Sequence, residues 1–187
     1  ETFKAFISSG NVPNLLLSGP PGTGKTTVAK AMLEEMGSDY IVINGSMSGN
    51  IDTLRNEITE FASTVSFTQG RKYVIIDEAD YLNANSTQPA LRNFMEQYSN
   101  NCGFIFTCNF PNRIIAPLHG RMAAIEFKYP KSDAPKVAAT FFKRICYILD
   151  AENIKYDKKV IAQFINKFYP DFRRTINELQ RYSINSS

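Results

Sequence analysis

Cysteine is scarce in this 187-residue sequence, and histidine occurs once. The three cysteines, Cys102, Cys108 and Cys146, are odd in number and form no C-x-x-C pair. This pattern argues against zinc ligation and against a disulfide framework. We expect buried thiols in a reducing compartment. The histidine, His119, is interpreted as a loop residue without a catalytic role.

Signals for membrane insertion and export are also missing. No apolar run reaches the length needed to cross a bilayer, and no signal peptide opens the chain. We therefore expect a cytoplasmic protein with no membrane partner. The chain begins with Glu1 instead of Met, which indicates a fragment of something longer. Its length suits one medium domain, or one domain with a small appendage.

Charge is unevenly distributed along the chain. Residues 1–127 hold nine Lys and Arg against twelve Asp and Glu, a net charge of −3, whereas residues 128–187 hold twelve against six, a net charge of +6. A basic C-terminal third could face a polyanion, or it could be the solvated surface of helices. Charge alone leaves both readings open.

Short apolar runs alternate with longer amphipathic stretches over residues 1–129, which predicts an α/β domain with a parallel sheet flanked by helices. The nearly continuous apolarity of the runs is typical of strands covered on both faces. The expected strands are Asn14–Ser18, Tyr40–Ile43, Lys72–Ile76, Gly103–Cys108 and Ala123–Phe127. The expected helices are Gly24–Met36, Ile51–Ser63 and Ser86–Tyr98, with a short one near Asn112–Leu118.

Residues 130–187 follow a break at "YPKSDAP" and indicate a small domain of three helices. Ser132 can cap the first helix, Asp157 can cap the second, and "YPDF" separates the second from the third, Phe172–Tyr182. No internal repeat interrupts this two-domain organisation.

The sequence Gly19-Pro20-Pro21-Gly22-Thr23-Gly24-Lys25-Thr26 fits G-x-x-x-x-G-K-[ST], the phosphate-binding loop. Glycines let backbone N–H groups point inward at a phosphate chain, and the following helix directs its positive dipole at the same charge. Lys25 reaches the terminal phosphates, and the Thr26 hydroxyl can ligate Mg²⁺. The alternative is a glycine-rich turn that binds nothing.

A second motif, "KYVIIDEAD", is an apolar strand that ends in acids. Asp77 at its tip would hold Mg²⁺, directly or through water, and Glu78 can polarise a water for attack on a γ-phosphate. The alternative is that these acids only cap the next helix. Because Glu78 would activate water, hydrolysis is favoured over a nucleotide kinase.

Three further polar residues complete a candidate catalytic set. Asn109 ends the strand "GFIFTCN", where it could sense the γ-phosphate or simply form a turn. Arg121 precedes the last strand and Arg173 begins the last helix; both could be ordinary surface arginines. In NTPases that use an arginine from outside the phosphate-binding loop, that arginine raises the rate of hydrolysis about 10³–10⁵-fold.

The order of these motifs resembles the AAA+ ATPases, a P-loop NTPase family, and within them the clamp-loader subunits. Blocks such as "LLLSGPPGTGKTTVAKAM", "VIIDEADYL", "QPALRNFMEQYSNNCGFIFTCN" and "PDFRRTINELQ" resemble replication factor C small subunits. The stretch "RNEITEFASTVSFTQGRKYVIIDEAD" is similar to the large subunit of T4-like phage clamp loaders. The resemblance covers nearly the whole chain.

This resemblance implies a nucleotide site for ATP and Mg²⁺ and assigns its residues. Lys25, Glu78, Asn109 and an arginine finger at Arg121, acting on the ATP of a neighbouring subunit, would be catalytic. Thr26 and Asp77 would hold the metal. The nucleotide would contact Gly19, Pro20, Pro21, Gly22, Thr23, Gly24, Lys25, Thr26, Thr27, Asp77 and Arg173, the last as a second sensor of the γ-phosphate.

The resemblance also implies partners. Family members form a pentameric spiral that opens a sliding clamp when ATP is bound and grips primer–template DNA; hydrolysis then releases the clamp. Helix starts facing the spiral's axis would contact DNA phosphates, here through Ser48, Asn50, Asn83, Asn85 and Arg92. A phage-encoded protein of this kind would act in the cytoplasm of a bacterial host.

Several positions depart from the family pattern. The usual Ser-Arg-Cys around the finger is Gly120-Arg121-Met122, and Asn93 replaces a second arginine. The adenine-packing N-terminal segment and the C-terminal collar are absent from the sequence. Competing hypotheses are another AAA+ DNA motor, such as a Holliday-junction helicase, and a nucleotide-binding scaffold subunit that does not hydrolyse.

Overall fold

The computed structural model describes residues 2–47, 51–64 and 70–185. The chain forms two compact units, which are described separately below. The first consists of Glu1–Gly19 and Lys25–Glu126, and the second of Pro20–Gly24 and Phe127–Ser187. Among the described residues, no helix combines the length and the apolarity that crossing a membrane would require.

The first unit is built on a five-stranded parallel sheet with the strand order β2-β3-β4-β1-β5. Its central strands are buried on both faces, which explains their continuous apolar sequences. The predicted parallel sheet is confirmed, with strand ends shifted by one residue. The strands are β1 (Leu15–Ser18), β2 (Tyr40–Asn44), β3 (Lys72–Asp77), β4 (Cys102–Cys108) and β5 (Ala123–Glu126).

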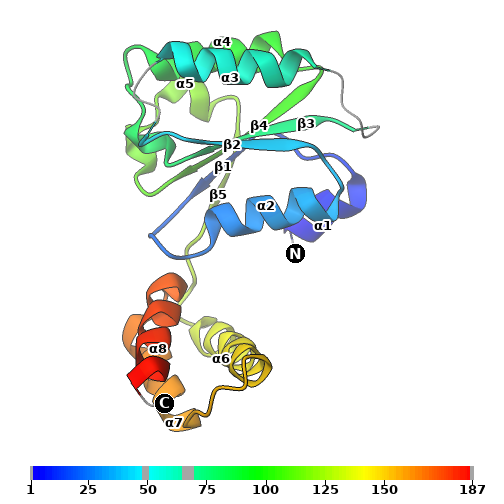
Figure 1. The fold of residues 1–187 in the computed structure, drawn as a ribbon. Coiled ribbons are helices and arrows are strands. Elements are labelled where there is room, and N and C mark those ends of the chain that lie inside the picture. The colour runs from blue at the N-terminus through cyan, green and yellow to red at the C-terminus, as the bar shows by residue number, and fades with distance from the viewer. Residues whose placement is uncertain (1, 48–50, 65–69, 186–187) are drawn as a thin grey trace. The chain divides into compact units, whose positions relative to one another are not determined.

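Helices cover both faces of this sheet (Figure 1). One face carries α3 (Ile51–Ser63), α4 (Thr87–Gln97) and α5 (Ala116–His119), and the other carries α1 (Thr2–Ser9) and α2 (Lys25–Glu35). The helix α1 was not predicted from the sequence. That helix has eight residues, which is shorter than the window over which helical periodicity is read, although its half-buried Phe3, Phe6 and Ile7 have the i, i+3, i+4 spacing of an apolar face.

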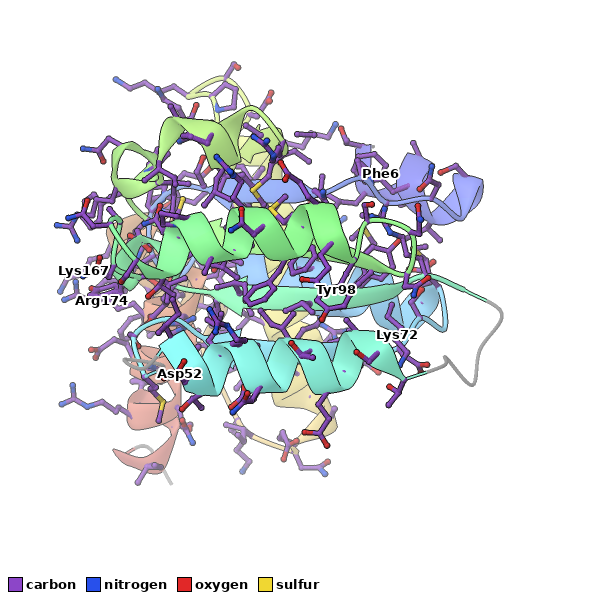
Figure 2. All side chains as sticks on the ribbon, turned by 90° about the horizontal axis from the view of Figure 1, so that it is seen from above. Phe6, Asp52, Lys72, Tyr98, Lys167 and Arg174 are labelled. Atoms are coloured by element: carbon purple, nitrogen blue, oxygen red, sulfur yellow. The ribbon has the colours of Figure 1, made fainter. Side chains whose placement is uncertain are left out.

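The helices α3 and α4 lie side by side over the sheet, as the view from above shows (Figure 2). Tyr98, just after α4, points toward α3, and its hydroxyl lies 3.4 Å from the Thr59 hydroxyl. The buried Lys72 begins β3 and donates from Nζ to the carbonyl oxygen of Phe61 at 3.0 Å. These contacts fix the two helices on the face that carries the largest apolar cluster.

Loops at the carboxyl ends of β3 and β4 contain short 3₁₀ turns, η1 (Ala79–Tyr81) and η2 (Pro111–Arg113). The helix predicted near Asn112–Leu118 is therefore two elements, η2 and α5. They are separated because Ile114 and Ile115 are extended (φ −87°, ψ 130° and φ −64°, ψ 145°).

The second unit contains α6 (Ala134–Ala151), α7 (Lys158–Phe168) and α8 (Phe172–Asn185), as the sequence predicted. The Asp157 side chain caps α7 by accepting from the N–H of Lys159 at 2.8 Å. The predicted cap at Ser132 is wrong. Asp133 occupies the N-cap position of α6, because a turn closed by its N–H on the Pro130 carbonyl (3.0 Å) delays the helix by one residue.

The start of α8 contacts the Gly22 backbone within this unit. The N–H of Phe172 donates to the carbonyl oxygen of Gly22 at 3.1 Å. A Cβ atom at Gly22 would lie 1.8 Å from Oδ1 of Asp171, the same oxygen that accepts the N–H of Arg174 at the start of α8 (2.9 Å). Only glycine fits at this position, which also has a φ of +75°.

Candidate functional site

The loop between β1 and α2 has the backbone that a phosphate cradle needs. Gly19, Gly22 and Gly24 have φ angles of 144°, 75° and 90°, all in the region that L side chains avoid. The Thr23 hydroxyl donates to the carbonyl oxygen of Pro20 at 2.8 Å, which holds the turn. Pro20 and Pro21 are exposed.

Lys25, the first residue of α2, is buried and brings two predicted residues together. Its Nζ donates to the Gly19 carbonyl at 2.7 Å and to Oδ1 of Asn109 at 2.9 Å. A buried ammonium requires such acceptors. Asn109 follows β4 and Lys25 follows β1. Because these two strands are neighbours in the sheet, the two side chains lie close together.

Asp77, at the end of β3, accepts hydrogen bonds from two hydroxyl groups. Its Oδ1 accepts from Oγ1 of Thr26 and from Oγ1 of Thr107, each at 2.5 Å. Thr26 and Asp77 were predicted to share a metal ion, and the structure places their oxygens in contact. One carboxylate and one hydroxyl match the sparse protein ligation of Mg²⁺, which keeps waters and substrate phosphates as its other ligands.

Thr107 was not predicted, although it is the polar residue inside the apolar strand "GFIFTCN". It is 2% exposed. Its hydroxyl donates to Asp77 and accepts the N–H of Glu78 at 3.1 Å. Thr107 therefore links both acids of the predicted hydrolytic pair.

Glu78 is half-buried and has a left-handed backbone, with φ 56° and ψ 43°. Such a conformation is uncommon for a residue with a side chain and clusters at functional sites. Gly45, after β2, lies against it: a Cβ at Gly45 would be 2.7 Å from the Glu78 carbonyl oxygen. The turn after β3 thus directs Glu78 out of the strand that ends at Asp77.

Asp80 is a second residue that the sequence analysis missed. Its buried carboxylate accepts through Oδ2 from the backbone N–H groups of Asn109 (3.2 Å) and Phe110 (3.1 Å). Within the described residues, its Oδ1 has no hydrogen-bond partner. Asp80 therefore anchors the loop that presents Asn109 to Lys25.

Gln88, in the first turn of α4, is also buried and was not predicted. Its Nε2 donates to the carbonyls of Leu82 (3.1 Å) and Arg113 (2.9 Å), and its Oε1 accepts the N–H of Ile115 (2.8 Å). This amide ties α4 to the segment that leads into α5. In the sequence, Gln88 could have been recognised as a polar residue on the inner face of an amphipathic helix.

Arg121 does not join the cluster around Lys25 and Asp77. It is exposed, follows α5, and hydrogen-bonds from Nε and Nη2 to Oε1 of Glu96 and from Nη1 to the Pro117 carbonyl. The following Met122 is buried in the core. The departure from Ser-Arg-Cys thus alters a core position and keeps the arginine at the surface.

Other predicted residues take no part in the hydrogen bonds described above. Thr27 is exposed on α2, and Arg173 is exposed in the first turn of α8, in the second unit. His119 ends α5 instead of lying in a loop, and its Nε2 lies 2.9 Å from the Pro111 carbonyl oxygen. Cys102 and Cys108 are buried as expected, whereas Cys146 is half-buried.

The predicted DNA contacts are only partly described. Ser48 and Asn50 lie outside the described residues. Asn83 and Asn85 are exposed before α4, and Oδ1 of Asn83 accepts the N–H of Asn85 at 2.8 Å. Arg92 is half-buried and donates from Nη2 to Oδ1 of Asn93 at 3.3 Å.

Comparison with known proteins identifies the family. The model of the ATPase family associated with various cellular activities (AAA) matches residues 15–129. The chain belongs to this AAA family. A second model, described as the AAA+ ATPase lid domain of the sliding-clamp-loader large subunit, matches residues 133–187. The P-loop fold and the lid helices after the AAA domain are thereby confirmed.

Curated relatives of this AAA protein include replication proteins. The sliding-clamp-loader large subunit of Enterobacteria phage T4 is 42% identical over 186 residues, covering 98% of this chain and 58% of that protein. The replication factor C small subunit of Sulfurisphaera tokodaii is 38% identical, covering 98% of this chain and 56% of that protein. The chain thus spans less than two thirds of these relatives' length.

Solved structures support the fold. The RuvB Holliday-junction branch-migration motor of Thermotoga maritima superposes with a TM-score of 0.71 at 20% identity, covering 94% of this chain and 56% of that chain. This likeness concerns the architecture alone.

Proposed function

We propose that this chain is an ATPase subunit of a DNA-replication sliding-clamp loader. The main support is the match of residues 133–187 to a clamp-loader lid domain, together with 42% identity to the phage T4 large subunit. Two hydrogen-bonded pairs in the first unit support it further, Lys25 with Asn109 and Thr26 with Asp77. In this proposal residues 1–129 are the nucleotide-binding domain and residues 130–187 are the lid.

ATP would bind with its phosphates against the N–H groups of Gly19–Thr26 and the Lys25 ammonium. Thr26 and Asp77 would hold Mg²⁺, which supplies positive charge that neutralises the β- and γ-phosphate oxygens. Asn109 is already bonded to Lys25. A γ-phosphate reaching Lys25 would therefore also meet the Asn109 amide, as a phosphate sensor requires.

Hydrolysis would use Glu78. Its carboxylate would accept a proton from a water, whose oxygen attacks the γ-phosphorus while the bond to the ADP oxygen breaks. Thr107 and Asp80 would position this centre, Thr107 through the Glu78 N–H and Asp80 through the loop that carries Asn109. Arg173 would contact the nucleotide from α8, and Arg121 would complete the site of a neighbouring subunit.

With ATP bound, the assembled loader would open a ring-shaped clamp and grip primer–template DNA. Hydrolysis would then release the closed clamp. Other loader subunits, the clamp and DNA are the partners that this cycle requires. The exposed Asn83 and Asn85, and the half-buried Arg92, remain the proposed DNA contacts among the described residues.

ATPase assays on the full-length subunit with its loader partners test the proposal. We expect sliding clamp and primed DNA together to stimulate turnover more than either alone, and Lys25→Ala to abolish it. Lys30→Ala, on the same helix, is the matched control. Stimulation by a four-way DNA junction without any response to the clamp would overturn the proposal in favour of another DNA motor.

A further inference from the structure

Arg121 is held by a carboxylate from a different element. Glu96 lies in the last turn of α4, and its Oε1 accepts from both Nε and Nη2 of Arg121. The Nη1 group of Arg121 donates to the Pro117 carbonyl in α5 at 2.9 Å. The guanidinium is thus fixed from two sides, by one side chain and one backbone oxygen.

Stability does not explain this arrangement. The Arg121 and Glu96 side chains are 37% and 53% exposed, and ion pairs that face solvent contribute little to folding. Arginine also loses considerable rotamer freedom when it is held in one geometry. The clear physical consequence is a guanidinium with a defined orientation at an exposed position.

The bonding pattern leaves the outer end of the guanidinium available. Arginine has five N–H donors, and the contacts with Glu96 and Pro117 use three of them. Within the described residues, one N–H on Nη1 and one on Nη2 make no hydrogen bond. Such a pair matches two oxygens of a phosphate group.

We propose that Glu96 is a positioning residue for Arg121, orienting the guanidinium so that its two remaining N–H groups meet the γ-phosphate bound by an adjoining subunit. The inference rests on the proposed trans role of Arg121. An arginine oriented before assembly loses less conformational freedom when the subunits meet, and it reaches the transition state in a reactive geometry. Glu96 would affect turnover without contacting the nucleotide.

The test compares Glu96→Ala and Glu96→Gln in the assembled full-length loader with clamp and primed DNA. We expect Glu96→Ala to lower kcat about 10-fold while the KM for ATP stays unchanged, because misorientation affects the transition state and not ground-state binding. Glu96→Gln keeps an acceptor oxygen in the same place and should retain most of the turnover. Glu57→Ala, an exposed acid on α3, controls for the loss of one charge.

A double variant separates positioning from a general structural effect. Arg121→Ala should lower kcat by about 10³-fold or more, and adding Glu96→Ala should lower the residual rate no further, since Glu96 acts only through Arg121. Unchanged or raised kcat in Glu96→Ala, with Arg121→Ala inactive, would overturn the positioning role and leave the proposed function intact. Full activity in Arg121→Ala would overturn the trans role and this inference together.

Discussion

At the scale of single residues, two adjacent acids end β3 in different environments. Asp77 accepts two hydroxyl groups, whereas Glu78 sits in a left-handed turn. Glu78→Gln removes only the proton acceptor. We expect the assembled protein to bind ATP as before and to lose turnover by a factor of about 100 or more. Calorimetric titration with ATP and Mg²⁺ measures the first quantity, and phosphate release measures the second.

The control for this substitution is Glu35→Gln, an exposed acid at the end of α2. It should change neither binding nor turnover. If Glu78→Gln still hydrolyses ATP at the parental rate, another residue activates the water.

Thr107 offers a second test at this scale. Thr107→Val keeps the shape of the side chain but removes the bonds to Asp77 and to the Glu78 N–H. We expect a loss of about 1–3 kcal/mol in the free energy of unfolding, because buried polar groups are left unsatisfied. Urea unfolding measures it. Thr107→Ser keeps the hydroxyl and should recover most of the loss; equal stability of the Val and Ser variants would contradict the account.

The sequence pointed to the residues proposed to bind the nucleotide but not to the buried polar residues that hydrogen-bond around them. Lys25, Thr26 and Asp77 stand out because their spacing is tied to phosphate and metal chemistry. Thr107, Asp80 and Gln88 form hydrogen bonds with backbone groups 25 to 29 positions away along the chain. Such contacts depend on which strands are neighbours, and a single sequence does not contain that information.

At the scale of elements, Gln88 connects α4 to the segment between η2 and α5. Gln88→Leu would leave the carbonyls of Leu82 and Arg113 and the N–H of Ile115 without their partner. At about 1–3 kcal/mol per unsatisfied buried group, we expect a loss of several kcal/mol in unfolding free energy. Urea unfolding measures it, and Gln97→Leu on the exposed face of α4 is the control. Equal effects of the two variants would show that the buried amide is dispensable.

The strand β4 begins and ends with a buried thiol. Burial raises the pKa of Cys102 and of Cys108 from 9.0 to about 11. Between these values the unfolded chain releases thiol protons that the folded chain keeps. The contribution to stability is therefore complete below about pH 8.5 and is lost as pH rises toward 11.

Urea unfolding at pH 8 and at pH 10.5 checks this expectation. A variant with Cys102→Ala and Cys108→Ala should lose less stability between the two pH values than the parent chain does. A parent and a double variant with the same pH dependence would show that the two thiols do not contribute.

The predicted boundaries of helices and strands agree with the structure wherever the apolar pattern of the sequence is strong. Strand β4 and helix α3 were predicted to within one residue, since continuous burial and a one-sided apolar face leave clear patterns. The prediction that Ser132 caps α6 was wrong because the helix start depends on the preceding turn, in which the Asp133 N–H donates to the Pro130 carbonyl. The helix α1 was missed because its eight residues are too few for the spacing of Phe3, Phe6 and Ile7 to stand out.

At the scale of the whole molecule, Arg121 lies outside the hydrogen-bonded cluster around Lys25 and is bonded to Glu96 and Pro117 instead. If Arg121 serves a neighbour, an isolated chain binds ATP with Mg²⁺ but hydrolyses it slowly. The missing arginine would account for about 10³–10⁵ in rate. We expect turnover per chain to rise with protein concentration. Fast turnover that is independent of concentration would contradict the trans role.

Mixing two inactive variants also tests whether Arg121 acts on a neighbouring subunit's nucleotide, and it needs no dilution series. Arg121→Ala subunits keep Glu78 but supply no finger, and Glu78→Gln subunits supply the finger but activate no water. Each variant alone should be inactive in the assembled loader. In a head-to-tail assembly, random mixing of equal amounts places an intact Glu78 beside a neighbour's intact Arg121 at about a quarter of the interfaces. Phosphate release should therefore reappear on mixing, which could not happen if both residues served the same subunit's nucleotide.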